Sequence, residues 1–307
     1  MSNQSSTNFS FYQLEEDHFK DVQYLIKAVF GKQVSIQHLK NKYKDYLNLG
    51  YISAIAYDDK QPIGFYGAIP QEFLHNGQKI IVAHACDSYT LKEYQGKGVH
   101  YNLAKTAYTI MKDKQVRFVY AFHSDNTYHS TKKLDWKERE RIARFHVNIN
   151  TFPFAKVYKR LKLKKQLQSK TTKVLRPYKI NKMEYKSNLS HQVFNPTFFE
   201  YKENLHSHHL IEIEECVFYI KIDSIMQVGF FTFKNYEKLK IAIDKLKEIG
   251  QNIGVNEILF QVSENSVMYS GLKEFITPKS SWIIGYLTFL DIDMSHFEFT
   301  YANLDTF

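Results

Sequence analysis

The sequence predicts an α/β fold, with helices on the faces of a sheet, and it predicts that this fold occurs twice in tandem. Apolar residues alternate along the chain between spacings of three to four, typical of helices, and spacings of two, typical of strands. The segment 79–89 is largely apolar on both faces, which indicates a strand buried in the middle of a sheet. The order of elements in the first half recurs in the second, although no residue-level repeat is visible.

The first half opens with two helical segments, 19–30 and 35–47, and the first carries an apolar stripe at Phe19, Val22 and Leu25. Strand-like and helical patterns then alternate. The expected strands are 51–57, 63–69, 79–89, 116–122 and 142–149, and the expected helices are 99–112 and 125–134, the second capped by Asp125 or Asn126.

The second half repeats this order. A helical segment near 195–205 precedes strands at 210–214, 217–222, 227–233, 255–262 and 282–290, with helices at 236–249 and 264–275. We therefore expect a first domain over 1–155, a basic linker over 156–185 and a second domain over 186–307.

The chain of 307 residues has a formal charge of +9 and an isoelectric point of about 9.1, which favours acidic partners. Part of this charge lies in one run without an acidic residue: Lys156, Lys159, Arg160, Lys162, Lys164, Lys165, Lys170 and Lys173. No nucleic-acid motif with stacking or base-reading groups accompanies the run. We interpret it as a solvated linker and do not expect nucleic acid as a partner.

Several protein classes are excluded by simple features of the sequence. The two cysteines, Cys86 and Cys216, are too few for a disulfide framework. The longest apolar stretch, 282–290, is far shorter than the roughly 20 residues that a bilayer requires. The first ten residues are polar and predict no secretory signal peptide. We therefore expect a cytoplasmic protein without a membrane span.

Other patterns that could carry chemistry are weak. The His-Ser-His-His sequence at 206–209 has no cysteine or carboxylate set at ligand spacing, so we expect no metal. Ser88 has no Gly-x-Ser-x-Gly elbow around it, which argues against a serine hydrolase. No Walker loop is present, which argues against nucleotide hydrolysis.

The segment between the buried strand and the next helix carries the clearest signal. Gly96 and Gly98 remove side chains where the turn enters the helix that begins at Val99. Exposed backbone amides at a helix start, together with the helix dipole, form a site for a phosphate or diphosphate. Lys97 adds a positive charge. The alternative interpretation is a tight strand-to-helix turn without a ligand.

This stretch resembles the GNAT superfamily of acyl-CoA-dependent N-acyltransferases. The family's acyl-CoA motif, Gln/Arg-x-x-Gly-x-Gly/Ala, here reads Gln-Gly-Lys-Gly-Val-His over 95–100, with His100 where a small residue is usual. The segments 87–90 and 122–128, and the Lys-Leu-Asp-Trp sequence at 133–136, resemble further stretches of some bacterial GNAT proteins. The similarity covers roughly residues 50–140.

The resemblance implies a mixed, mostly antiparallel GNAT-type sheet, flanked by helices, in each of the two tandem domains. In the second half the strand ending at Phe233 runs almost directly into the helix at Tyr236, without a glycine-rich loop. We therefore expect the first domain to bind acyl-CoA. The second domain would be non-catalytic, and it would form a wall of the acceptor cleft or mediate formation of a homodimer.

The resemblance also implies the reaction: transfer of an acyl group, most simply acetyl, from acyl-CoA to a primary amine, without a metal. A polar backbone group near the end of the buried strand would stabilise the oxyanion. The residues expected to bind the co-substrate are Ser88, Tyr89, Thr90, Gln95, Gly96, Lys97, Gly98, Val99, His100 and Asn126.

Three residues are candidates for proton transfer. Asp87, at the end of the buried strand, is the preferred base, although a carboxylate there could instead organise the loop. His123 is the second candidate, whereas His84 fits a core histidine better. In GNAT enzymes the general acid is often a tyrosine at the position that Thr131 occupies here. Tyr128, one helical turn earlier, is either its replacement or a packing residue.

The resemblance suggests an amino sugar in surface-polysaccharide synthesis as the acceptor. Two alternatives remain open at this point. One is an aminoacyltransferase of the Fem type, in which the basic run would contact tRNA. The other is a non-catalytic GNAT-like scaffold, which the departures at His100 and Thr131 suggest.

Overall fold

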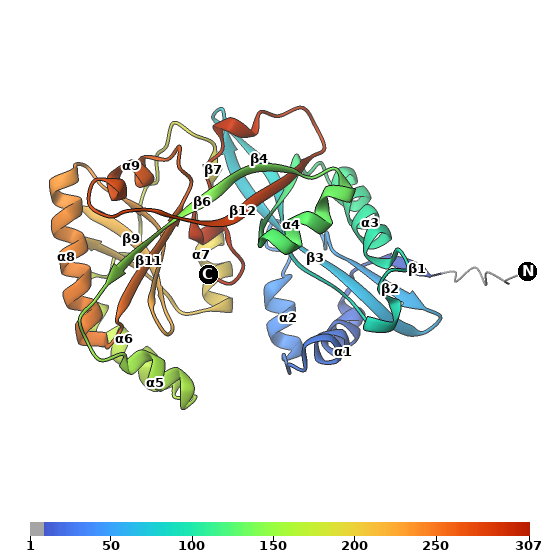
Figure 1. Ribbon diagram of the computed structural model, residues 1–307, viewed down its shortest axis with the longest axis horizontal. Coiled ribbons are helices and arrows are strands. Elements are labelled where there is room, and N and C mark those ends of the chain that lie inside the picture. The colour runs from blue at the N-terminus through green and yellow to red at the C-terminus, as the bar shows by residue number, and fades with distance from the viewer. Residues whose placement is uncertain (1–8) are drawn as a thin grey trace, which may run out of the picture. The chain divides into compact units, whose positions relative to one another are not determined.

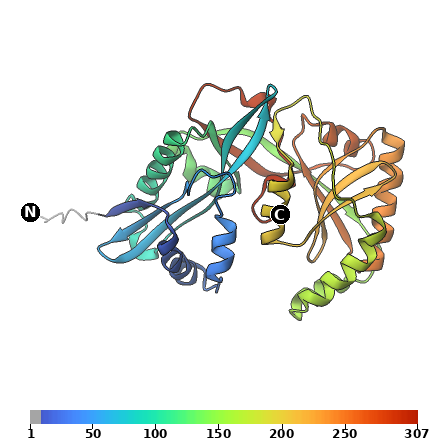
Figure 2. The same ribbon diagram turned by 180° about the vertical axis from the view of Figure 1, so that it is seen from behind.

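The computed structural model describes residues 9–307, which form two compact units. The first unit contains residues 9–138 and 285–292, and the second contains residues 139–284 and 293–307 (Figures 1 and 2). We expect no signal peptide from the polar start of the chain. Residues 1–8 of that start lie outside the described residues. Within residues 9–307, no helix combines the length and the apolar character that crossing a membrane requires.

The sheet of the first unit contains five strands in chain order, with the end of a later strand at its edge. These are β1 (Ser10–Gln13), β2 (Ala54–Asp58), β3 (Gln61–His75), β4 (Gln78–Thr90) and β5 (Phe118–His123), with the end of β12 (Lys279–Thr288) beside β5. Strands β1 to β4 pair antiparallel, and β5 pairs parallel to β4. The expected mixed, mostly antiparallel sheet is confirmed, and β4 occupies the interior position that its two apolar faces indicated.

Four α-helices flank this sheet: α1 (Phe19–Phe30), α2 (Ile36–Lys42), α3 (Val99–Asp113) and α4 (Asp125–Thr131). Figure 1 shows α1 and α2 on one face and α3 and α4 on the other. Helix α3 lies against the sheet because Leu103, Ala107 and Met111, spaced by four residues, form one apolar stripe that is fully buried.

The start of α4 differs from the sequence-based expectation. We expected Asp125 or Asn126 as the capping residue, whereas the side chain of Ser124 accepts a hydrogen bond from the backbone N–H of Thr127. Serine and aspartate are both good N-cap residues, so local sequence preference does not separate them. The extended backbone of Ser124, where β5 ends, decides the position.

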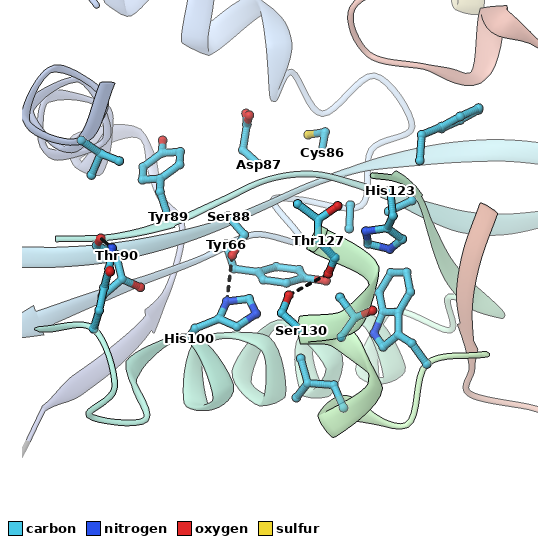
Figure 3. Close-up of a pocket in the computed structure, with 18 of the residues that line it drawn as sticks. Tyr66, Cys86, Asp87, Ser88, Tyr89, Thr90, His100, His123, Thr127 and Ser130 are labelled. Atoms are coloured by element: carbon cyan, nitrogen blue, oxygen red, sulfur yellow. Dashed lines mark hydrogen bonds between the residues drawn. The ribbon is translucent and has the colours of Figure 1, made fainter. Parts of the chain in front are cut away.

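A β-bulge interrupts the pairing of β3 and β4. Gly67 pairs with Asp87 and Ala68 pairs with Ala85, so Cys86 is an extra residue in β4. Regular strand alternation would send the side chains of Cys86 and Asp87 to opposite faces of the sheet. The bulge instead places both side chains on the same side of β4, where Cys86 is half-buried (Figure 3).

The second unit repeats the strand pairing of the first. Its strands are β6 (Lys137–Asn148), β7 (His191–Gln192), β8 (His208–Ile213), β9 (Cys216–Ile222), β10 (Met226–Thr232) and β11 (Glu257–Val262), and its helices are α5 (Phe154–Arg160), α6 (Lys164–Leu175), α7 (Pro196–Leu205), α8 (Tyr236–Ile253) and α9 (Val267–Lys273). Strands β8, β9 and β10 pair antiparallel, and β11 pairs parallel to β10 after the crossover helix α8 (Figure 2). The junction from β10 to α8 contains no glycine-rich loop, as expected, and Asn235 caps α8 directly.

The strand that follows α4 and the end of the strand that follows α9 each belong to the unit formed mainly by the other half of the chain. Strand β6 follows α4 in the chain but pairs antiparallel with β11 in the second unit. The end of β12, which follows α9, lies beside β5 in the first unit. Each sheet is therefore completed by a strand from the other half of the chain.

Residues 156–185 are not the linker that the sequence led us to expect. Most of this segment folds into α5 and α6, which belong to the second unit, and the division between the units falls after Glu138. Leu167, Thr171 and Leu175 are buried at a spacing of four residues, so α6 has a core-facing stripe between its lysines. Because lysines lie between these buried residues, the sequence alone did not indicate the stripe.

Candidate functional site

The site is built where β4 and β5 separate. The two parallel strands are paired at Ala83 with Val119 and at His84 with Tyr120. Beyond these residues β4 continues to Thr90 beside β3, and no further register pair joins it to β5 in the described chain. Backbone polar groups on this side of β4 are consequently open to a ligand, because no neighbouring strand uses them.

A cavity of about 660 Å³ opens at this separation, and all of its lining belongs to the first unit. We call it the β4–β5 cavity. It is lined by Val29, Phe30, Tyr66, Ala85, Cys86, Asp87, Ser88, Tyr89, Thr90, Gln95, His100, Tyr108, Ala121, Phe122, His123, Thr127, Ser130, Thr131, Leu134 and Trp136. Its volume lies within the range of ligand-binding pockets.

The lining residues come from both sides of β4. Figure 3 shows Asp87, Cys86 and Tyr89 on the side of α1, and Ser88 and His100 on the side of α3. A cavity lined from both sides can hold two reactants that approach each other through the gap in the sheet.

The glycine loop is shaped for backbone contacts at the start of α3. Gly96 and Gly98 adopt left-handed backbone conformations, with φ of 76° and 78°. The N–H of Asn102 donates to the Gly98 carbonyl at 3.1 Å, which is the first hydrogen bond of the helix. The amides of the three residues before Asn102 therefore have no intrahelical acceptor, and the helix dipole makes this end positive.

Side chains on either side of the glycines fix the loop. The Gln95 side-chain amide donates to the Thr90 carbonyl at 3.2 Å, which ties the loop to the end of β4. The side chain of Val99 is buried in the core, so this residue presents its backbone rather than its side chain. Lys97 lies over the ring of Tyr94, with its Nζ atom 5.1 Å from the ring centroid. Gly96, Lys97, Gly98 and Val99 are absent from the lining of the β4–β5 cavity.

His100 points into the cavity from the first turn of α3. Its Nδ1 atom is 2.8 Å from the Ser88 hydroxyl, a contact that links α3 to β4 (Figure 3). Burial lowers the pKa of His100, so the imidazole is neutral at neutral pH and can share one hydrogen bond with Ser88. The departure of His100 from the family motif thus gives the cavity a polar wall.

Asp87 is held by the end of α2, a contact that the sequence does not announce. The Lys42 Nζ atom donates to Asp87 Oδ2 at 2.7 Å, and the Tyr43 hydroxyl donates to the same oxygen. Burial, followed by the charge of Asp87, raises the pKa of Tyr43 well above its usual value, so this hydroxyl remains a donor. Asp87 is therefore both a cavity residue and an organising carboxylate.

His123 lies at the end of β5 with its ring nearly enclosed. It contacts Trp136 edge to face, at 5.2 Å between ring centroids, and its Nε2 atom is buried without a hydrogen-bond partner. A Cβ atom at Gly285 would lie only 2.9 Å from this nitrogen, which explains why glycine is needed there. Burial lowers the pKa of His123 to about 4, so the ring is neutral at neutral pH. His84, in contrast, is buried in the sheet against Tyr120, as expected of a core histidine.

Tyr128 and Asn126 lie on α4, outside the cavity lining. The Tyr128 ring is buried 5.8 Å from His123, and burial raises its pKa. Thr131, at the position where the family often has tyrosine, does line the cavity and donates its hydroxyl to the Tyr128 carbonyl at 2.8 Å. Asn126 is exposed in the first turn of α4.

An aromatic and polar group, which the sequence did not lead us to expect, lies at the α3 side of the cavity. The Trp136 Nε1 atom donates to the Tyr108 hydroxyl at 2.7 Å, and the Tyr66 hydroxyl lies 3.5 Å from the same oxygen. Trp136 belongs to the Lys-Leu-Asp-Trp sequence, which was the available signal. In that sequence Asp135 adopts a left-handed backbone conformation, with φ of 63°.

In the part of the chain from residue 9 onward, no three His, Cys, Asp or Glu side chains are grouped so that they could hold a metal ion.

Comparison with known proteins identifies the first unit. Residues 10–138 match the family model described as acetyltransferase (GNAT) domain. This segment includes β1 to β5, α3 with its glycine loop, and every residue that lines the β4–β5 cavity. No curated protein matches the chain.

Solved structures share the fold at low sequence identity. A GCN5-related N-acetyltransferase from Kribbella flavida superimposes with a TM-score of 0.61 and 10% identity, covering 92% of this chain and 72% of that one. A putative acetyltransferase from Pyrococcus horikoshii gives 0.54 and 13%, covering 98% and 96%. The N-myristoyltransferase of Saccharomyces cerevisiae, with bound myristoyl-CoA, gives 0.51 and 11%, covering 94% and 79%. At these identities the similarity shows the fold.

Proposed function

Since residues 10–138 belong to the GNAT superfamily, we propose that the protein is an N-acyltransferase that moves an acyl group, most simply acetyl, from acyl-CoA to a primary amine. The superfamily fold supports the general activity.

One observation carries the proposal: the β4–β5 cavity lies where the sheet opens and beside the start of α3. The free amides at that start suit the diphosphate of CoA. The gap between β4 and β5 suits the thioester arm, and backbone groups near Ser88 to Thr90 suit the thioester carbonyl. The side of β4 that carries Asp87 is then left for the amine.

The reaction is nucleophilic attack of the amine on the thioester carbonyl, followed by departure of CoA as a thiolate. Holding both reactants in one cavity supplies up to roughly 7–11 kcal/mol of the barrier reduction when their alignment is good. A backbone N–H at the open edge of β4 would stabilise the oxyanion of the tetrahedral intermediate.

The amine must lose a proton, and Asp87 is the proposed base, acting directly or through one water molecule. Its contacts with Lys42 and Tyr43 fix its orientation at the cavity wall. His123 is the second candidate, because its ring is neutral and lines the same cavity. Its pKa of about 4 makes it a weaker base than an unperturbed histidine.

The departing thiolate must be protonated, or released and protonated by solvent. Tyr128 was our candidate acid, but its position outside the lining and against His123 favours a packing role. A thiolate is a good leaving group, so transfer from solvent is sufficient, and we propose that route.

For the acceptor we propose an amino sugar of surface-polysaccharide synthesis. The hydroxyl groups of Thr127, Ser130 and Thr131 line the cavity and could receive the hydroxyls of a sugar.

The test combines binding with turnover. A thermal-shift series with CoA, acetyl-CoA and longer acyl-CoAs should raise the melting temperature by several degrees, because a ligand that binds only the folded state stabilises it. Release of free thiol should then follow when glucosamine and other amino sugars are added with the preferred acyl-CoA. No stabilisation by any CoA species would contradict the proposed donor. Stabilisation without thiol release with any amine would contradict the enzymatic assignment and favour a scaffold.

A further inference from the structure

The second unit contains a cavity of its own, about 390 Å³ in volume, which we call the lysine cavity. It lies between the end of α5, the turn into α6 and the first half of α6 on one side, and the segment before β8 and the end of β9 on the other. Its lining residues are Lys159, Lys162, Lys164, Leu167, Gln168, His206, Ser207, Lys221, Ile222 and Asp223. The basic run that the sequence analysis assigned to a solvated linker therefore forms one wall of a cavity.

The described lining carries four lysines and a single carboxylate. Lys159 pairs with that carboxylate, Asp223, at 2.6 Å. Lys221 is 7% exposed, and its ammonium donates to the carbonyl of Thr306, which is a neutral partner. Lys159, Lys162 and Lys164 are exposed at the opening of the cavity, and Lys221 is buried deeper in it. With one carboxylate against four ammonium groups, the cavity has an excess of positive charge, which favours an anionic ligand.

The electrostatics of Lys221 agree with this interpretation. Burial, with added repulsion from Lys159 and Lys164, lowers the pKa of Lys221 to about 8, although Asp223 and Asp305 act in the opposite direction. The strand β9 thus holds a lysine whose charge is not fully balanced by its surroundings.

The backbone around the cavity shows the same imbalance. Helix α6 begins with Lys164 and Lys165, and no acidic residue occupies its first turn, which is an unfavourable arrangement at the positive end of a helix. Its N-cap residue, Leu163, has no side chain that can accept a hydrogen bond. Lys162 adopts a left-handed backbone conformation with φ of 58°, which is strained for lysine. An anion at this point would accept hydrogen bonds from the backbone amides at the start of α6. It would also offset the repulsion among the lysine ammonium groups.

We propose that the lysine cavity binds the phosphate or diphosphate group of a small phosphorylated molecule. The enclosed volume suits a compact ligand. The described lining contains no phenylalanine, tyrosine or tryptophan on which nucleic-acid bases could stack. The site lies wholly in the second unit, and it does not depend on the acyltransferase assignment of the first.

Binding is measured on the full chain with inorganic phosphate, pyrophosphate, glucose 6-phosphate and a nucleoside diphosphate, by calorimetry at constant ionic strength. The test variant is Lys162→Gly with Lys164→Gln, which removes two charges and also relieves the left-handed strain at residue 162. The matched control is Lys240→Gln, an exposed lysine on α8 of the same unit. Melting temperatures of all three proteins show whether each variant is folded.

We expect wild type and Lys240→Gln to bind at least one of the four phosphates alike, and the double variant to bind it about tenfold or more weakly, because each lysine supplies a charge-assisted hydrogen bond. Preference among the four probes then distinguishes a phosphate monoester from a diphosphate. Equal affinity in the folded double variant, or no binding of any of the four, would overturn the proposal. Binding of single-stranded RNA that pyrophosphate does not compete away would also overturn it, in favour of a nucleic-acid surface.

Discussion

Among single residues, the glycines of the loop can be tested cleanly because the chain contains a matched second glycine. Gly98 and Gly77 have almost the same left-handed φ, 78° and 76°, and both have room for a Cβ atom. Gly98 begins α3, whereas Gly77 lies in the turn between β3 and β4. Any non-glycine residue at either position is strained by about 1–2 kcal/mol.

We predict that Gly98→Glu and Gly77→Glu lower the free energy of unfolding by similar amounts, while Gly98→Glu alone abolishes CoA binding. The reason is that a carboxylate at residue 98 would repel the diphosphate, whereas one at residue 77 lies in a distant turn. Urea unfolding and calorimetry with CoA measure the two effects. Retained CoA affinity in Gly98→Glu would remove the loop from the binding site.

Asp87 presents two roles that a single substitution does not separate. Asp87→Asn should lower kcat by roughly 100-fold or more if the carboxylate is the base. Tyr43→Phe and Lys42→Met remove its two partners and leave the carboxylate in place. We expect these variants to change kcat much less. Equal losses in all three would instead assign Asp87 to the organisation of α2.

At the scale of elements, the position of α3 on the sheet depends on Gly64 in β3. A Cβ atom there would lie 3.0 Å from Leu103 Cδ1 and 3.1 Å from Val99 Cγ1, both on α3, and 3.2 Å from the carbonyl of Tyr89. We predict that Gly64→Ala displaces the start of α3, destabilises the fold by about 1–3 kcal/mol and weakens CoA binding.

The control for this prediction is Gly271→Ala in α9. A Cβ atom at Gly271 would lie 2.6 Å from the Phe233 ring, so overpacking there is at least as severe as at Gly64, but the second unit carries the strain. Thermal melting measures the stability of both variants, and titration with CoA measures their affinity for the co-substrate. Gly64→Ala with unchanged CoA affinity would contradict a role for the start of α3.

Local sequence patterns predicted much of the first unit because its elements obey local rules. The two apolar faces of β4, the apolar stripe of α3 and the glycines between them each lie within a short segment, and the cavity residues Ser88, Gln95 and His100 follow from them. The contact of Asp87 with Lys42 and Tyr43 joins residues more than 40 positions apart, which periodicity does not encode.

Three further features lay beyond local patterns. The bulge at Cys86 reverses strand alternation without a sequence signal such as glycine or proline at the bulged position. The exchange of β6 and β12 depends on which sheet edge each strand reaches, and not on its own sequence. In α6 the buried stripe at Leu167, Thr171 and Leu175 is interrupted by lysines, so its composition resembles a linker.

At the scale of the whole molecule, buried histidines make the fold sensitive to acid. Burial lowers the pKa of His123 and of His209 to about 4, and it also lowers the pKa of His208 well below its usual value. Above the unfolded value of about 6.5 these rings are neutral in both states and contribute nothing. Between about pH 6.5 and 4 the unfolded chain binds protons that the folded chain does not, so stability falls as the pH falls. Glu298, whose pKa burial raises, opposes this trend in part.

We predict that His123→Gln reduces the loss of stability by about 1.4 kcal/mol per pH unit in this window, because that is the contribution of one such histidine. His129→Gln, an exposed histidine on the neighbouring helix α4, serves as the control and should follow wild type. Urea unfolding at several pH values between 7 and 4 gives the slopes. A His123→Gln slope equal to wild type would show that His123 titrates normally in the folded protein.

The central claim is that backbone amides at the start of α3 bind acyl-CoA. Hydrogen exchange of the full chain with and without acetyl-CoA measures those amides directly. We predict slower exchange at residues 96–101 and at the end of β4 when acetyl-CoA is present, with little change at the junction of β10 and α8. Unchanged exchange at residues 96–101 under saturating acetyl-CoA, or protection confined to the second unit, would contradict it.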